Sequence, residues 1–154
     1  MGRWSLLRTG VGVVEAESER FARMLLRRWG IVMRELATRE THVPPWREIV
    51  RALRTLETRG EVRGGRFVAG TVGEQFALPQ AVEALRALRR VGGEGEVAVV
   101  SAADPLNLVG IVLPGSRLAP AAREMIAYRD GVVAEVGELG AVRHRLGRLG
   151  LRRS

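Results

Sequence analysis

The segment from Pro45 to Val68 restricts the fold of this chain more than any other stretch of its 154 residues. Its first part, PPWREIVRALRTLETRG, repeats apolar side chains at helical spacing, which predicts an amphipathic helix that begins at Pro45 and is ended by Gly60. The face opposite the apolar one carries three arginines: Arg47, Arg51 and Arg54. Such a helix buries one face in a core and presents cations on the other.

A tight hairpin is expected to follow this helix. The stretch Glu61–Val68, EVRGGRFV, contains Gly64 and Gly65, and two adjacent glycines suit a turn that needs positive φ. Arg63 and Arg66 flank that turn. A helix with an arginine face and an arginine-tipped hairpin are together the second half of a winged helix-turn-helix, a module that binds nucleic acid.

The elements before and after this segment complete the same fold. Apolar periodicity predicts a helix over residues 15–29 and a short helix over residues 31–38, both ahead of the arginine helix. Residues 1–14 are expected to form a strand or an arm, and a further helix is expected over residues 80–91. Residues 1–92 are therefore assigned to a winged-helix domain with an N-terminal arm and an extra helix.

A second, β-rich module is expected after the glycines at positions 92, 93 and 95. Its four predicted strands cover residues 96–101, 107–113, 125–129 and 132–138. Asp130-Gly131 lies between the last two and is the strongest short hairpin signal in the chain. The predicted fold class is α+β: a winged helix-turn-helix followed, over residues 93–140, by a small antiparallel β-rich module that forms part of a barrel. Residues 141–154 are expected to be a frayed basic tail.

The charge of the chain is strongly basic and unevenly distributed. The net charge is +8, and all 25 basic residues are arginine, whose guanidinium binds phosphate with two hydrogen bonds. Residues 1–92 carry a net +7, residues 93–140 a net −4 and residues 141–154 a net +5. The basic surface therefore belongs to the winged helix and the tail, and it suits nucleic acid.

Several function classes are excluded by what the sequence lacks. Without cysteine the chain forms no disulfide and no cysteine-based zinc site, and the cytoplasm is the expected compartment. Without lysine it has no P-loop for ATP. His42 and His144 have no ligand spacing near them, so no metal site is expected. No apolar run approaches the roughly 18 residues that span a bilayer, so no membrane partner is expected.

Asp104 is the candidate catalytic residue. It lies in SAADPLN, residues 101–107, and the only asparagine of the chain, Asn107, follows three positions later. One interpretation makes Asp104 a general base or an electrostatic stabiliser that faces a flipped nucleotide. The other is an Asx-Pro turn in which Asp104 caps backbone N–H groups, and the turn chemistry favours this second interpretation.

Glu74 and Gln75 also leave two interpretations open. They either meet a base edge or a catalytic water, or they remain in solvent while the following Phe76 and Leu78 pack inward. The second arrangement is the more common for a loop of this kind.

Six motifs occur in a distinctive order: GRWSLL (2–7), VPPWRE (43–48), RGGRFVAG (63–70), GEQFALP (73–79), SAADPLNLVGI (101–111) and YRDG (128–131). In this order they resemble the C-terminal segment of the bacterial large helicase-related (Lhr) proteins, over about residues 2–136. SAADPLNLVG with GEQFALP is the most specific part, and the basic tail lies outside the resemblance.

The resemblance implies a superfamily 2 DNA helicase that acts in DNA repair, with motor domains that use ATP and Mg upstream of this segment. The present chain has no motor, so by itself it is expected neither to hydrolyse ATP nor to unwind DNA, and no cofactor is expected in it. Long members of the family end in a region similar to winged-helix DNA glycosylases with an attached β-barrel, which implies a base-excision role. The catalytic glutamine motif of those glycosylases has no clear match here.

The favoured hypothesis is a nucleic-acid-binding module of an Lhr-type helicase whose phosphate contacts come from Arg47, Arg51, Arg54, Arg63 and Arg66. Its expected partners are single- or double-stranded DNA and upstream helicase domains, in cis or in trans. Two alternatives stay open: a DNA glycosylase module that uses Asp104, and a winged helix that docks proteins instead of DNA.

Overall fold

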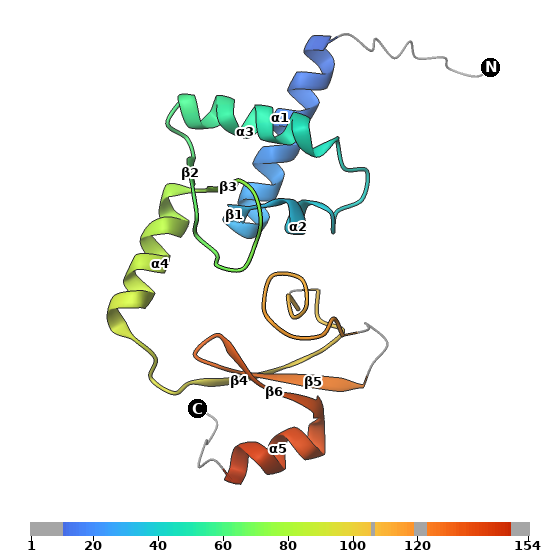
Figure 1. Cartoon of the computed structure of the whole chain (residues 1–154), viewed down its shortest axis with the longest axis vertical. Helices are drawn as coiled ribbons and strands as arrows, with labels where there is room; N and C mark the ends of the chain where they lie inside the picture. The colour runs from blue at the N-terminus through green and yellow to red at the C-terminus, as the bar shows by residue number, and fades with distance from the viewer. Residues whose placement is uncertain (1–10, 106, 119–122, 149–154) are drawn as a thin grey trace, which may run out of the picture. The chain divides into compact units, whose positions relative to one another are not determined.

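The computed structural model describes residues 11–105, 107–118 and 123–148 (Figure 1). The helices and strands follow in the order α1 (Val11–Trp29), β1 (Ile31–Val32), α2 (Arg34–Ala37), α3 (Trp46–Thr58), β2 (Arg63–Gly65), β3 (Gln75–Ala77), α4 (Pro79–Val91), β4 (Val97–Ser101), β5 (Glu124–Arg129), β6 (Val132–Glu138) and α5 (Leu139–Arg148). The described strands form two antiparallel three-stranded sheets, which with the helices confirms the α+β fold class.

The chain divides into two compact units, Met1–Arg86 and Ala87–Ser154. The first ten residues of the expected N-terminal arm lie outside the described residues. The rest of that arm, from Val11 onward, belongs to α1, so the helix begins four residues earlier than the periodicity predicted.

The first unit is built around the apolar faces of α1 and α3. Leu25 of α1 and Ile49, Leu53 and Leu56 of α3 have no exposed surface. The three α3 residues are spaced three or four positions apart, so a single stripe of that helix is buried. Figure 1 shows α3 lying across α1, and Phe76 of β3 belongs to the same core.

Gly30 ends α1 and turns the chain into the small sheet. Its φ of 71° lies in the left-handed region, which favours glycine. Its carbonyl accepts a hydrogen bond of 2.9 Å from the N–H of Leu78. The next residues, Ile31–Val32, pair with β3 as strand β1, so the helix predicted over residues 31–38 is wrong at its start. The β-branched pair is extended, and only Arg34–Ala37 is helical.

The wing has a longer loop than the sequence predicted. β2 pairs with β3, and the register sets Gly64 opposite Phe76. Gly64 and Gly65 therefore lie inside a strand, and the tight turn expected between them is wrong. Gly64 is needed for a close approach, because its N–H donates to Glu57 Oε1 at 2.8 Å and an added β-carbon would lie 2.7 Å from that oxygen. The loop of the wing runs over residues 66–74.

The side-chain amide of Gln75 holds the wing loop in place. This side chain is buried, and its Oε1 accepts hydrogen bonds from the N–H groups of Phe67 and Val68 at 2.8 and 2.9 Å. Its Nε2 donates to the carbonyl of Val68 at 2.9 Å and to the hydroxyl of Thr71 at 2.6 Å. The expectation that Gln75 lies in solvent or reads a base edge is therefore wrong, because its polar atoms are used inside the wing.

The second unit is a sheet with the strand order β4-β5-β6. Asp130 and Gly131 join β5 to β6 with φ values of 49° and 77°, both positive as a type I′ turn requires, and the predicted hairpin is confirmed. The Asp130 carboxylate also accepts hydrogen bonds from the N–H groups of Gly95 at 2.9 Å and Glu96 at 3.0 Å. One residue thus fixes the turn and the start of β4.

Side chains of the second sheet alternate between its two faces. Ala127 of β5 packs against Val142 and Leu146 of α5. Its neighbour Ile126 faces the opposite side and packs against Val109, from the segment between β4 and β5. Both faces of the central strand are therefore covered.

Two expectations for this unit are wrong. Residues 107–113 form no strand, because Val109 and Leu113 make only an isolated bridge within a turn. Residues 139–148 form helix α5 instead of a frayed tail, since Val142 and Leu146 lie one turn apart and bury an apolar stripe. The rest of the tail, residues 149–154, lies outside the described residues.

Replacing Gln75 with alanine is expected to destabilise the first unit by about 3 kcal/mol. The change leaves two N–H groups of the wing loop without an acceptor, and each such group costs about 1–3 kcal/mol when buried. Urea unfolding followed by the fluorescence of Trp29 and Trp46, which pack against the first core, measures the loss. Gln80→Ala, at an exposed position of α4, is the matched control. Equal midpoints for the two variants would contradict the anchoring role of Gln75.

Candidate nucleic-acid interface

The exposed face of α3 carries the three arginines that the sequence predicted. Arg47, Arg51 and Arg54 are 81%, 62% and 64% exposed. The opposite face of α3 is buried in the core, so packing determines which side of this helix meets solvent. α3 therefore presents a row of cations about two turns long.

Each α3 arginine is held by a carboxylate. Glu48 accepts hydrogen bonds from Arg47 Nε at 3.3 Å and from Arg51 Nη1 at 2.6 Å. Arg54 Nη2 lies 2.8 Å from Oε1 of Glu74 on the wing. Exposed ion pairs of this kind are worth about 0.2–1 kcal/mol, so a phosphate can displace the carboxylate at modest cost. The α3 arginines are thus positioned and partly neutralised before a ligand binds.

The wing supplies two arginines of a different kind. Arg63 begins β2 and Arg66 follows it, and both side chains are exposed. They do not flank a tight turn, because the glycines between them are part of a strand. In the part of the chain that the structure describes, no carboxylate forms an ion pair with either side chain. These two guanidiniums therefore need no carboxylate displaced before they bind a phosphate.

Two contacts join α3 to the wing. Glu57 of α3 accepts the N–H of Gly64 on the outgoing arm of the wing. Arg54 of α3 binds Glu74 on the returning arm. Because both arms are tied to the same helix, α3 and the wing present one continuous surface.

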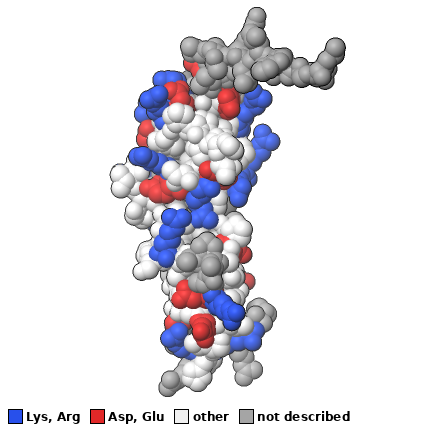
Figure 2. Space-filling model, turned by 90° about the vertical axis from the view of Figure 1, so that its right-hand side faces the viewer, with Lys and Arg blue, Asp and Glu red and all other residues white. Residues whose placement is uncertain are grey.

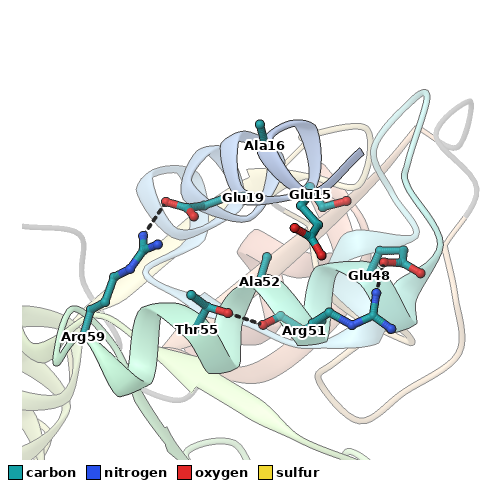
Figure 3. A pocket seen from close by; sticks show the side chains of 9 residues that line it. Glu15, Ala16, Glu19, Glu48, Arg51, Ala52, Thr55 and Arg59 are labelled. Atoms are coloured by element: carbon teal, nitrogen blue, oxygen red, sulfur yellow. Dashed lines mark hydrogen bonds and ion pairs between the residues drawn. The ribbon is translucent and has the colours of Figure 1, made fainter. Parts of the chain in front are cut away.

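The other flank of α3 is acidic. A hollow of about 350 Å³ lies between α3 and α1 (Figure 3). Its walls include the carboxylates of Glu15, Glu19 and Glu48 and the guanidiniums of Arg51 and Arg59. Arg59 Nη1 and Glu19 Oε1 are 2.9 Å apart. Carboxylates outnumber guanidiniums here, so phosphate is disfavoured on this flank and favoured on the wing flank.

The surface as a whole is not a uniform basic patch. On the face drawn in Figure 2, arginine and carboxylate side chains are interspersed. Ion pairs such as Arg23 Nη2 to Glu19 Oε1 at 3.0 Å use part of the positive charge internally. Direct contacts with phosphate therefore depend more on which arginines are unpaired than on the net charge of +8.

Asp104 lies in a turn that its neighbours hold together. Its N–H donates to the carbonyl of Ser101 at 3.0 Å, and its carbonyl accepts the N–H of Asn107 at 2.9 Å. The buried side chain of Asn107 donates to the carbonyl of Ala102 at 2.9 Å and accepts the N–H of Val109 at 3.0 Å. The segment is thus a fixed turn organised by the Asn107 amide.

Tyr128 of β5 lies within the electrostatic reach of Asp104. Burial raises the pKa of the Tyr128 hydroxyl, and the negative charge of Asp104 raises this pKa further. The phenol is therefore neutral near pH 7 and can donate a hydrogen bond.

The residues that the structure describes provide neither a metal-binding cluster nor a membrane-spanning helix. They contain no group of three or more histidine or acidic side chains arranged to hold a metal ion. None of their helices is both long enough and apolar enough to cross a membrane.

Gln75 and Glu74 are the site residues whose roles the sequence did not indicate. Gln75 forms hydrogen bonds inside the wing loop. Glu74 forms an ion pair with Arg54, which lies twenty positions earlier in the sequence. The sequence holds one signal for Gln75, which directly precedes the short apolar run Phe76–Leu78. A polar side chain at the start of a buried strand requires hydrogen-bond partners. No local signal pairs Glu74 with α3.

Comparison with known proteins identifies the family. Residues 13–97 match the family model of the large helicase-related protein, winged-helix domain. The chain is also 31% identical over 116 residues to a protein of Escherichia coli (strain K12) named Lhr helicase/uracil glycosylase. That match covers 73% of this chain and 8% of the relative, so the chain spans a small part of the relative's length. The chain belongs to the large helicase-related (Lhr) family, and the expected winged helix is confirmed.

Proposed function

We propose that this Lhr-family chain is a nucleic-acid-binding module of a helicase that acts in DNA repair, and that it grips and orients DNA without doing chemistry on it. The observation that carries the proposal is the single surface of α3 and the wing, where five exposed arginines gather. In helix-turn-helix proteins the recognition helix enters the major groove, and neighbouring basic groups bind phosphates.

The wing arginines lead this contact. Arg63 and Arg66 are free to bind phosphate with two hydrogen bonds each. Arg47, Arg51 and Arg54 add contacts once Glu48 and Glu74 rearrange. Binding of this kind reads the backbone of DNA and depends strongly on salt.

The proposed partners follow from the family. DNA, single- or double-stranded, binds the α3 and wing surface, and the motor that uses ATP and Mg belongs to helicase domains upstream, in cis or in trans. The segment over residues 93–140 carries a net charge of −4, which disfavours DNA. We assign it to contact with neighbouring protein domains.

A DNA glycosylase module is the second candidate, supported by the name of the Escherichia coli relative. In this reaction water adds to C1′ of the deoxyribose while the bond from C1′ to the base breaks, and uracil leaves. Asp104 would accept the proton of that water, and Tyr128 would donate a hydrogen bond to the departing base. The third candidate is a winged helix that docks proteins. This hypothesis predicts that the chain has no affinity for DNA.

Replacing Arg63 and Arg66 with alanine is expected to weaken duplex binding more than replacing Arg47 and Arg51. Each phosphate contact that is lost lowers the slope of log K against log salt by about 0.9, so the wing variant should lose about two units of slope. Fluorescence anisotropy titrations of a duplex and a single strand over a range of salt concentrations measure both quantities.

The control for this experiment removes equal charge elsewhere. Arg89→Ala with Arg90→Ala takes two exposed arginines from the last turn of α4. A salt slope that is unchanged in the wing and α3 variants would rule out this interface. Absence of wild-type binding even at low salt would favour protein docking.

Glu74→Gln is expected to raise duplex affinity about twofold to fivefold. The change releases Arg54 from an ion pair worth about 0.2–1 kcal/mol and removes a negative charge from beside the bound phosphate. Glu83→Gln, at an exposed position of α4, makes the same change in net charge and is the control. An equal gain in both variants would show that general charge, and not the release of Arg54, is responsible.

Asp104→Asn tests the glycosylase candidate. If the chain excises uracil from DNA, the variant is expected to lose about a hundredfold or more in rate, as a general base does. Alkali-labile sites in a labelled uracil-containing strand measure excision, and Glu94→Gln, exposed in the same unit, is the control. Full activity of the Asp104 variant would exclude this carboxylate as the base.

A further inference from the structure

We infer that Val72 is a wedge, which the wing inserts between stacked bases of the DNA held by α3 and the wing arginines. The inference rests on the proposed function, because it needs DNA at the wing. Val72 is 83% exposed, more than any other large apolar side chain in the described part of the chain. At this exposure the side chain makes little contact with the core, so it is available for contact with a ligand.

The backbone on both sides of Val72 is held in place. Thr71, directly before it, is buried, and its hydroxyl contacts the carbonyl of Val68 at 3.2 Å and Gln75 Nε2 at 2.6 Å. Gly73, directly after it, has a φ of 95°, and the two residues beyond it are held by the contact of Glu74 with Arg54 and by the hydrogen bond of Gln75 to Thr71. The side chain of Val72 is therefore exposed on a braced loop. A wedge needs this combination, since a loop that yields under load cannot separate two bases.

The position of Val72 also fits contact with bases. Two residues after it, Glu74 binds Arg54 of α3, so the arm that carries Val72 returns to the arginine face of that helix. At the other end of the loop Arg66 is exposed. Guanidiniums thus lie near both ends of the loop, where they can hold the phosphates while an apolar side chain between them meets the bases.

The chemistry of the side chain suits this task. Proteins that kink DNA insert apolar side chains between base steps and partly unstack them. Valine is branched at Cβ and stiff at χ1, so it loses little rotamer freedom on insertion. The glycines at positions 70 and 73 flank it, and nothing lies within 4 Å of a β-carbon added at either, so the loop keeps a slim profile that a groove can admit.

The test measures unstacking directly. Duplexes that carry 2-aminopurine at successive positions are saturated with the full chain, and the emission of 2-aminopurine rises where a base is unstacked. The wild type is expected to raise the emission at one or two adjacent positions. Val72→Ala is expected to bind about threefold to tenfold more weakly, as loss of part of one buried apolar side chain implies. At saturation this variant should lose most of the rise in emission.

Val132→Ala is the matched control, because it makes the same change at a valine that is 70% exposed on β6. It should behave like the wild type in both affinity and emission. Wild-type emission from saturated Val72→Ala, or a wild type that binds without raising emission at any position, would overturn the wedge and leave the DNA-binding function standing. A wild type that binds neither duplex nor single strand would overturn both.

Discussion

The wing has little strand pairing, and four hydrogen bonds of the Gln75 side chain, two accepted and two donated, hold it instead. β2 and β3 pair over only three residues, and a loop over residues 66–74 joins them. Such a loop has too few ladder hydrogen bonds to fix its own course. Gln75 is adjacent in β3 to Phe76, which is buried in the core, so the core fixes the amide and the amide fixes the loop. The shape of the proposed DNA-binding surface is therefore set from inside the molecule.

Charge acts on this surface at two ranges. The net charge of +8 attracts a polyanion from a distance, and salt screens that attraction. At contact distance, the ion pairs of each arginine determine how readily it binds a phosphate. Arg51 and Arg54 must exchange a carboxylate for the phosphate, whereas Arg63 and Arg66 need not. A surface with both kinds of arginine avoids the self-repulsion that a row of unpaired cations on one helix would cause.

The sequence predicted those parts of the fold that local signals determine. The Asp130-Gly131 hairpin has its own turn chemistry, and it lies where expected. Gly64 looked like the same kind of signal, yet it serves a contact with Glu57, seven positions away, that no short window contains. The candidate site divides in the same way: helical spacing located the arginines of α3, but the partner of Arg54 is Glu74, which only the fold brings near. Contacts between distant residues are therefore what the sequence alone could not supply.

Binding of DNA and catalysis at Asp104 require different properties of this chain. The turn around Asp104 is accounted for by the Asn107 amide and by backbone hydrogen bonds, so its rigidity needs no catalytic explanation. A carboxylate near Tyr128 becomes a base-excision site only if a nucleotide leaves the stack, which costs a few kcal/mol. A wing that unstacks bases would lower that cost for whichever domain performs the reaction. Because phosphate contacts at the α3 and wing surface do not depend on any chemistry at Asp104, binding is the primary role that we propose for this surface.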